Sequence, residues 1–191
     1  MILTHHNLFR LALAILLFAC TVQHTSGKTN QRLSPGQQPP PVRLSGEEGG
    51  RVDGDAWSSN VIKGKVTVLF YVDPDERDLN EHVAERLKAE ELAGPDFQSI
   101  VVINMAATWV PNWILNRLLK RKQKKFPLAV YVKDEEKTLV EQWGLPDESY
   151  TILLFAADGS LRYKRSGRFS ADQTARFIDL TKQLLQQGPD E

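Results

Sequence analysis

Continuous apolar runs dominate the hydrophobic pattern of this chain. The first covers residues 66–72, leaves a Gly-Lys turn and stops at Asp73-Pro74, and the second covers residues 100–103 within the stretch 97–104. A third run follows at 128–132. Because the first two runs are apolar or β-branched at every position, they predict strands buried on both faces in the middle of a sheet.

Helical spacing of apolar residues follows the first run. A helix is predicted from near Leu79 to about Ala93, where Gly94-Pro95 ends it. Asp78 precedes Glu81 by three residues, which is the spacing of a capping box with Asp as the cap. A strand, a helix and a strand in this order predict a right-handed parallel crossover.

A second helix is predicted to start at Pro111 and to end before Pro127. One side of it is apolar and carries Trp113, Ile114, Leu115, Leu118 and Leu119. The other side is basic and carries Arg117, Lys120, Arg121, Lys122, Lys124 and Lys125. This basic side could bind anionic headgroups, with Trp109 and Trp113 at the lipid interface. The pattern favours the alternative, a solvated helix face with Trp113 in the core.

The carboxyl-terminal third predicts a hairpin followed by a helix. The stretches 151–156 and 161–164 flank an Asp-Gly turn, which is typical of a hairpin. Ser170 with Gln173 three residues later predicts a capped helix. Short elements are expected at 42–44 and 139–143. The order of all elements predicts one α/β domain with a central mixed sheet of about five strands and flanking helices.

The amino-terminal segment has the pattern of an export signal. Residues 11–19 are continuously apolar, and this is too short for a bilayer span of about 20 residues. Residues 17–20 resemble a lipobox ending at Cys20, which predicts a lipid anchor; cleavage around 25–27 would instead discard Cys20. We expect a signal peptide over 1–27 and an exported, periplasmic protein, with or without this membrane tether.

The remaining boundaries follow from composition. Residues 28–41 are polar and Pro-rich, which predicts a flexible tether that bears no core. The folded domain is expected over 42–187 and a tail over 188–191. The 191-residue chain carries 24 basic and 24 acidic residues, so no overall field favours nucleic acid as a partner. Cys20 is the only cysteine, so the domain has no thiol in either alternative.

Acidic residues fill the loop between the first strand and the first helix, at Asp73, Asp75, Glu76 and Asp78. Such oxygens can hold a hard cation, but carboxylates are also favourable at a helix start without any ion, and no calcium-loop spacing is present. We therefore predict no metal and no cofactor. His82 is the only histidine in the predicted domain and is expected on a helix surface.

Several of these stretches carry a family resemblance over residues 41–187. GKVTVLFYVDP and YTILLFAADGSL resemble the active-site strand and the distal hairpin of thioredoxin-like proteins. More narrowly, GKVTVLFYV, WGLPDES, ADGSLRYKRSG and the last helix resemble the bacterial YtfJ family of exported thioredoxin-fold proteins. The resemblance implies a thioredoxin-like fold for the α/β domain.

The same resemblance implies an active-site loop without its reacting atoms. The two Cys-x-x-Cys positions fall on Asp75 and Asp78, and the cis-proline position falls on Tyr150, which we predict to be trans. Thiol-disulfide exchange and peroxidase chemistry are therefore not expected. The leading hypothesis is a non-catalytic binding protein with a protein partner in the cell envelope. The alternatives are a non-thiol enzyme or metal-binding protein that uses Asp75 and Asp78, and a binder of anionic membranes through residues 117–125.

Overall fold

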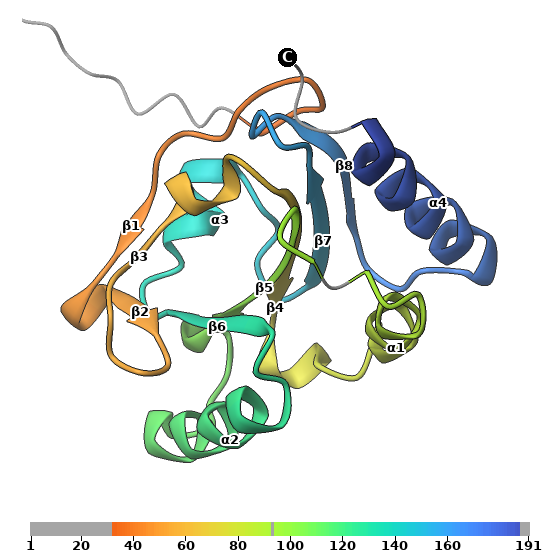
Figure 1. The fold of residues 1–191 in the computed structure, drawn as a ribbon. Helices are drawn as coiled ribbons and strands as arrows, with labels where there is room; N and C mark the ends of the chain where they lie inside the picture. The colour runs from red at the N-terminus through yellow and green to blue at the C-terminus, as the bar shows by residue number, and fades with distance from the viewer. Residues whose placement is uncertain (1–31, 93, 188–191) are drawn as a thin grey trace, which may run out of the picture.

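The computed structural model describes residues 32–92 and 94–187 and is built around a six-stranded mixed sheet (Figure 1). The strand order is β2-β6-β5-β4-β7-β8. These strands are β2 (Gly49–Arg51), β4 (Val66–Val72), β5 (Phe97–Asn104), β6 (Ala129–Asp134), β7 (Tyr150–Phe155) and β8 (Leu161–Ser166). β4, β5 and β6 are parallel, and the other neighbours pair antiparallel. The predicted mixed sheet is confirmed, with one strand more than expected.

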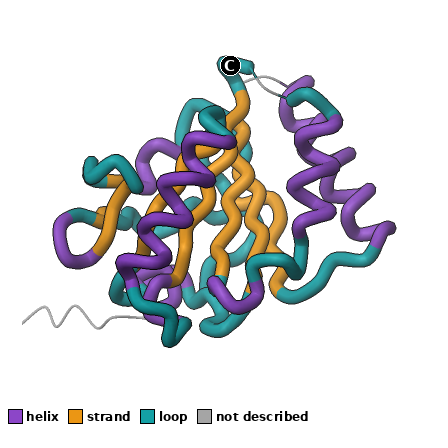
Figure 2. The backbone as a smooth tube through the Cα atoms, turned by 90° about the horizontal axis from the view of Figure 1, so that it is seen from below, coloured by secondary structure: helices purple, strands orange, loops and turns teal. Residues whose placement is uncertain are grey.

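Helices lie on both sides of the strands (Figure 2). They are α1 (Glu81–Ala89), α2 (Asn112–Lys125), α3 (Thr138–Trp143) and α4 (Ala171–Gln187). Short 3-10 turns include η3 (Pro74–Glu76) and η4 (Met105–Ala107), and a small antiparallel pair joins β1 (Arg43–Leu44) to β3 (Trp57–Ser58). Within the described ranges, none of the helices has the length and apolar character that a membrane crossing requires.

Strand β4 separates two hydrophobic cores, because its side chains alternate between the two faces of the sheet. Phe70 and its even-numbered neighbours pack in the core that also holds the buried residues of α1, α2 and α4. Leu69 and Tyr71 point to the other core, together with Trp143 of α3 and Trp57 of β3. Every residue of β4 is buried, which confirms the prediction from its unbroken apolar run.

The carboxyl-terminal elements agree with their sequence signals. Strands β7 and β8 form the hairpin predicted around the Asp-Gly turn. The backbone N–H of Ser170 donates to Gln173 Oε1 at 2.9 Å, and the backbone N–H of Gln173 donates to Ser170 Oγ at 3.2 Å. These two reciprocal bonds form the capping box expected at the start of α4.

The start of α1 differs from the prediction. The helix begins at Glu81 with Asn80 at the N-cap position and ends at Ala89, so Asp78 is not the cap. Asn80 is fully buried, and its side chain donates to the Gly167 carbonyl at 2.9 Å and accepts from the Phe169 N–H at 2.8 Å. Its amide thus ties α1 to the segment before α4. Asp78 is exposed, with a carboxylate oxygen 3.7 Å from Arg77 Nε.

The described part of the predicted tether, residues 32–41, packs on the domain and corrects the expectation of a free spacer there. Leu33 is buried and its N–H donates to the Trp143 carbonyl at 3.1 Å. The indole N–H of Trp143 donates to the Pro40 carbonyl at 2.9 Å. A single leucine among polar and proline residues is enough to anchor the strip beside α3. The predicted signal over 1–27, with Cys20, and the tail over 188–191 lie outside the described residues.

Candidate functional site

Three buried polar residues mark the carboxyl edge of the parallel strands. Asp73 follows β4, Asn104 ends β5 and Asp134 ends β6, and each exposes 4% or less of its surface. Carboxyl ends of parallel strands meet at one edge of a sheet, which is where α/β proteins commonly place their sites. We call these three residues and the loops that follow them the carboxyl edge.

Asp73 closes the acidic loop onto the start of β7. Its Oδ1 accepts from the Asp75 N–H at 2.8 Å and caps η3, while its own N–H donates to the Ser149 carbonyl at 3.1 Å. Burial raises the pKa of Asp73, and the Asp75 and Glu76 carboxylates raise it further, against the lowering effect of the Asp75 N–H. The loop therefore has one buried carboxylate that is fixed by its own backbone.

The other carboxylates of the loop do not converge on one point. Asp75, Glu76 and Asp78 are exposed. Asp75 Oδ1 accepts from Thr108 Oγ1 at 3.1 Å, and Asp78 lies beside Arg77 instead. Across residues 32–92 and 94–187, no three His, Cys, Asp or Glu side chains are grouped as a metal ion would need. His82 lies exposed on α1, as expected.

Tyr150 lies beside the end of β4, the strand that leads into this loop. It is the first residue of β7, pairs with Val72 at the end of β4, and meets the Phe70 ring edge-on at 6.1 Å between centroids. All peptide bonds of the described chain are trans, which agrees with the prediction for Tyr150. Burial raises the pKa of its hydroxyl. A buried aromatic ring thus begins β7, directly after Ser149, whose carbonyl accepts from the Asp73 N–H.

A second polar cluster at the carboxyl edge was not predicted. Asp147 accepts from Asn104 Nδ2 at 2.8 Å, from Lys137 Nζ at 2.5 Å and from the Glu148 N–H at 3.1 Å. Burial acts against the charge of Asp147, but the hydrogen bonds from Lys137, Asn104 and Glu148 outweigh it and lower its pKa. The available signal was the polar Asn104 at the end of an apolar run, at the same edge as Asp73.

Asp134 is also engaged within the fold. Its Oδ2 accepts from the Tyr71 hydroxyl at 3.1 Å and from the Leu139 N–H at 3.0 Å, and its Oδ1 accepts from the Thr138 N–H at 2.8 Å. The carboxylate therefore caps the start of α3 and satisfies a buried tyrosine. Burial and this neighbouring charge raise the pKa of Tyr71. Asp73 and Asp134 thus hold the segments that follow their strands, whereas Asn104 bonds to Asp147 in the loop before β7.

The second candidate site, the outer side of α2, differs from its prediction. Leu115 and Leu119 are buried as expected, but Trp113 and Leu118 are 64% and 46% exposed, so the expectation of Trp113 in the core is wrong. The buried side of α2 is narrow, because Leu115 and Leu119 are the only buried residues of this helix. The six predicted basic residues are all exposed, so they share the solvent side with Trp113.

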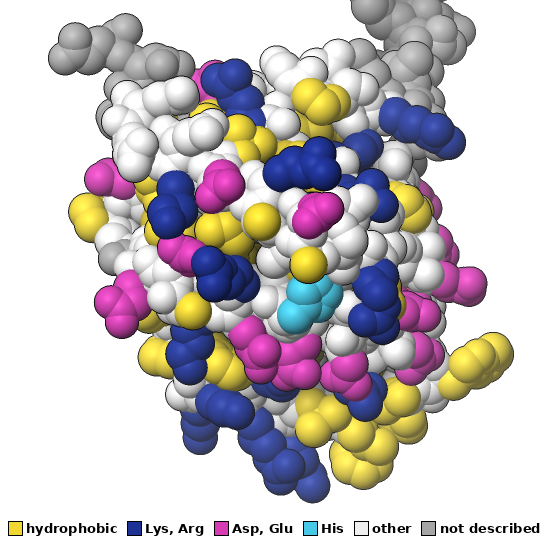
Figure 3. Space-filling model, turned by 90° about the vertical axis from the view of Figure 1, so that its right-hand side faces the viewer, with side chains coloured by type: hydrophobic (Ala, Val, Ile, Leu, Met, Phe, Trp, Pro, Cys, Tyr) yellow, Lys and Arg dark blue, Asp and Glu magenta, His cyan; other side chains and the backbone are white. Residues whose placement is uncertain are grey.

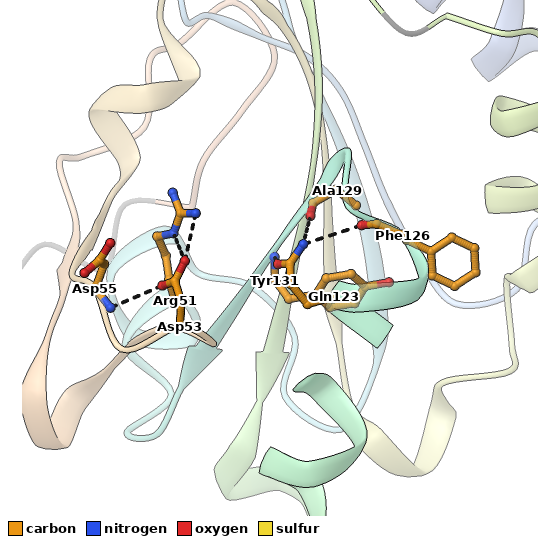
Figure 4. Close-up of polar contacts among 7 residues, drawn as sticks. All are labelled: Arg51, Asp53, Asp55, Gln123, Phe126, Ala129 and Tyr131. Atoms are coloured by element: carbon orange, nitrogen blue, oxygen red, sulfur yellow. Dashed lines mark hydrogen bonds and ion pairs between the residues drawn. The ribbon is translucent and has the colours of Figure 1, made fainter. Parts of the chain in front are cut away.

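Gln123 fixes the rotation of α2 about its axis (Figure 4). Its Nε2 donates to the Ala129 carbonyl at 2.8 Å, and its Oε1 accepts from the Tyr131 N–H at 3.1 Å. This side-chain amide joins the helix to β6, beyond the turn at Phe126. On the opposite side of the close-up, Asp53 accepts from Arg51 and from the Asp55 N–H in the turn after β2.

Three of the six cations of α2 contact aromatic rings, and none of the six pairs with a carboxylate in the described chain. The Arg117 guanidinium lies 5.7 Å from the centre of the Trp113 ring. Lys122 and Lys125 lie 5.8 and 5.2 Å from the centre of the Phe126 ring, and Lys88 of α1 approaches the same ring at 5.8 Å. No ion pair in the described chain includes any of the six basic residues of α2. Their charges are available to an external partner.

Comparisons with known proteins agree on fold and family. The family model described as "Bacterial protein of unknown function (YtfJ_HI0045)" matches residues 43–184. The protein named "Uncharacterized protein YtfJ" of Escherichia coli K12 is 22% identical over 180 residues, which are 90% of this chain and 97% of that protein.

Solved structures show the same fold at low identity. The exposed lipoprotein thioredoxin of Streptococcus pneumoniae has a TM-score of 0.54 and 16% identity, over 74% of this chain and 99% of that one. The thiol peroxidase of Chromobacterium violaceum has a TM-score of 0.57 and 12% identity, over 81% and 90%. The fold is thioredoxin-like, as the sequence resemblance implied.

Proposed function

Because this chain belongs to the YtfJ family of bacterial proteins, we propose that it acts in the cell envelope as a thioredoxin-fold protein that binds a partner without exchanging thiols with it. The protein partner is unidentified. The protein binds and does not catalyse, and its fold serves to present the surfaces that contact the partner.

The observation that carries this proposal is the chemistry at the end of β4. By the resemblance, the paired thiols of thioredoxins correspond to Asp75 and Asp78, and the only cysteine of the chain is Cys20, ahead of the domain. The similar structures include a thioredoxin and a thiol peroxidase, and both kinds of chemistry need a thiolate. A carboxylate cannot form the mixed disulfide on which such exchange depends.

The envelope location is supported by the amino-terminal pattern. The apolar stretch 11–19 with Cys20 directly behind it is typical of an exported or lipid-anchored protein. One of the similar structures is itself named an exposed lipoprotein. Mass spectrometry of the mature amino terminus separates a lipidated Cys20 from cleavage near residues 25–27.

The alternative of an enzyme that uses Asp75 and Asp78 has less support. General acid-base or metal-assisted chemistry needs carboxylates that face a shared point. Asp75 is held by Thr108, and Asp78 lies 3.7 Å from Arg77. The double variant Asp75→Ala with Asp78→Ala tests this alternative, which requires the variant to lose an activity or a metal uptake that the folded parent has.

The proposal is tested by insulin reduction and peroxide turnover with the purified protein. We expect no turnover above buffer. The matched control is Asp75→Cys with Asp78→Cys, which restores two thiols three residues apart at the same loop. Cα atoms three residues apart in such a turn are within the range of about 4.4–6.8 Å that a disulfide bridges, so the control should gain exchange activity. Turnover by the parent protein would overturn the proposal.

A further inference from the structure

Exposed hydrophobic side chains are concentrated around α2. Five large hydrophobic side chains are exposed in the described chain, and four of them lie within residues 109–128: Trp109, Trp113, Leu118 and Leu128. Trp109 is fully exposed and Leu128 is 78% exposed. Scattered exposed apolar residues are ordinary, but a cluster of this kind marks a contact site. We call these four residues and the six basic residues of α2 the α2 surface.

The α2 surface follows the long axis of one helix. Residues at spacings of three and four line a shallow groove of about 510 Å³, namely Trp113, Asn116, Arg117, Lys120, Arg121 and Lys124. All six belong to α2, so the groove is a shallow space between side chains on the outer face of one helix. It does not lie between two helices or between a helix and the sheet. Leu118, Lys122 and Lys125 form a parallel row with the same spacing. A convex helix face of this kind fits a flat surface better than it fits a protruding partner.

Charge on this surface has one sign. The helix holds six basic residues and no acidic one, and Lys88 of α1 adds a seventh cation near Phe126. At the amino-terminal end of α2, Glu135 accepts from Asn112, and Asp75 accepts from Thr108 in the preceding loop. Figure 3 shows Lys and Arg side chains gathered at the lower edge of the molecule, the edge that α2 occupies in Figure 1, with hydrophobic side chains projecting from the same edge.

We infer that the α2 surface docks the domain on an anionic lipid bilayer. Each cation near such a bilayer is attracted by the negative surface charge, and tryptophan favours the interface because its ring is apolar and its indole N–H is polar. A helix that is basic and carries Trp and Leu lies in the plane of the headgroups. A partner bound through its charge alone, such as the phosphate backbone of duplex DNA, would not require the four exposed apolar side chains. The inference rests on the proposed function, because it adds a membrane contact to a binding protein of the cell envelope whose protein partner is unidentified.

The first measurement is sedimentation of the protein with vesicles. The protein is purified from cells that process it, and its amino terminus is read by mass spectrometry. Vesicles of phosphatidylcholine with about 30 mol% phosphatidylglycerol are compared with vesicles of phosphatidylcholine alone. We expect the anionic vesicles to bind at least about tenfold more strongly, and the difference to shrink when salt is raised from about 0.1 M to about 0.5 M. Equal binding to both vesicles would overturn the inference.

Charge reversal on α2 provides the second measurement. Lys120→Glu, Arg121→Glu and Lys124→Glu together should weaken binding to the anionic vesicles by about 100-fold or more. The matched control reverses three exposed arginines of β8, the loop after it and α4: Arg165→Glu, Arg168→Glu and Arg176→Glu. Both triple variants change the net charge by the same amount, so a difference in their vesicle binding reports the position of the charges and not their number. The control should stay within about threefold of the parent. An equal loss in both variants would refute a specific surface.

Tryptophan separates a lipid surface from other anions. Trp109→Ser with Trp113→Ser leaves the charge unchanged and should weaken vesicle binding by about tenfold. In the parent, vesicles should shift the tryptophan emission to shorter wavelength, because Trp57 and Trp143 are already buried and only the two exposed rings can enter the interface. Glycerol phosphate, the soluble headgroup, should cause no such shift. A shift with glycerol phosphate, or stronger binding to duplex DNA than to vesicles, would contradict the inference.

The result is independent of the test for the proposed function. Failure of the vesicle experiments with no thiol turnover would leave a binding protein with another partner. Thiol turnover would end the proposed function whatever the vesicles show.

Discussion

The carboxyl edge and the α2 surface use polar side chains in opposite ways. At the carboxyl edge, Asp73, Asn104 and Asp134 are buried; Asp73 and Asp134 bond to the segments that follow their strands, and Asn104 bonds to Asp147 before β7. On the α2 surface, the charged groups are exposed and none has a carboxylate partner in the described chain. Buried polar groups that bond internally stabilise the fold, whereas unpaired exposed groups are free to bind.

This comparison reverses the usual expectation for the fold. The end of β4 is the position where relatives of this fold carry reactive groups, and here it is filled by groups that cap turns and helices. The surface that remains chemically available lies on a helix that carries no reacting atom. The proposed function thus assigns binding to another face of the fold, while the end of β4 keeps a structural part.

Among the polar groups of these two regions, the largest expected effect is at Asp134. Asp134→Ala leaves the Tyr71 hydroxyl and the N–H groups of Thr138 and Leu139 buried without an acceptor, so the free energy of unfolding should fall by about 3 kcal/mol. Urea unfolding measures this change. Tyr71→Phe is the control that removes one of the three bonds and should cost about 1 kcal/mol. A loss below about 1 kcal/mol for Asp134→Ala would show that the carboxyl edge is not a structural network.

The next effect is on the inner side of α2. Gln123→Ala removes the bonds to the Ala129 carbonyl and the Tyr131 N–H and should lower the free energy of unfolding by about 1–2 kcal/mol. Lys124→Ala, one residue further on the exposed side, should change it by less than about 0.5 kcal/mol. Equal effects of the two substitutions would mean that the inner and outer sides of α2 do not differ as described.

A smaller and pH-dependent effect is expected at Asp147. Because its pKa is lowered in the folded protein, its contribution is present at neutral pH and is lost as the pH falls through the folded pKa, below its usual value of about 3.9. The raised pKa of Lys137 keeps that partner charged throughout this range. Asp147→Asn should therefore lower stability at pH 7 by less than about 1 kcal/mol, since the pair is partly exposed.

Thermal unfolding at several pH values and at high salt checks this prediction. The gap between Asp147→Asn and the parent should narrow as the solution is acidified and as salt is added. A gap that is constant from pH 7 to about pH 3 would show that the Asn104 and Glu148 hydrogen bonds matter and the charge does not.

The sequence predicted the parts of the fold whose local and tertiary signals agree. The unbroken run of β4, the Asp-Gly hairpin and the capping box at Ser170 are each specified within a few residues, and all three are observed. Asp78 failed as a cap because Asn80, two residues later, bonds across to Gly167, which no local pattern reveals.

Other elements depend on contacts that the pattern does not contain. β2 forms in a glycine-rich stretch that has the composition of a turn, because Gly49 at φ 126° passes so close to β6 that a Cβ would lie 2.0 Å from the Lys133 carbonyl oxygen. Leu33 anchors residues that are otherwise polar. At the candidate site, the acidic loop was found from the sequence, but the bonds that join Asp147 to Asn104 and Lys137 span distant segments.

The exposure of Trp113 was missed because all the apolar residues from 113 to 119 were assigned to one side of the helix. Leu115 and Leu119 define the buried direction; at about 100° per residue, position 118 lies about 80° from it and position 113 about 140° from it, towards solvent. Packing against β6 keeps the buried apolar stripe of α2 narrow, since Gln123 holds the helix at a fixed rotation. The rotation of the helix decides whether the tryptophan belongs to the core or to the α2 surface, and composition alone does not specify this rotation.

The smallest expected effect on stability tests that assignment directly. Trp109→Ala with Trp113→Ala should change the free energy of unfolding by less than about 0.5 kcal/mol, because both rings are exposed and contribute little to the core. Trp143→Ala, at a fully buried ring, should cost about 3–5 kcal/mol in the same urea titration. A loss above about 1.5 kcal/mol in the double variant would place the two rings among the groups that hold the fold. A neutral result leaves two large apolar side chains that stabilise nothing in the isolated domain, and burial against an external surface is then the physical use that remains for them.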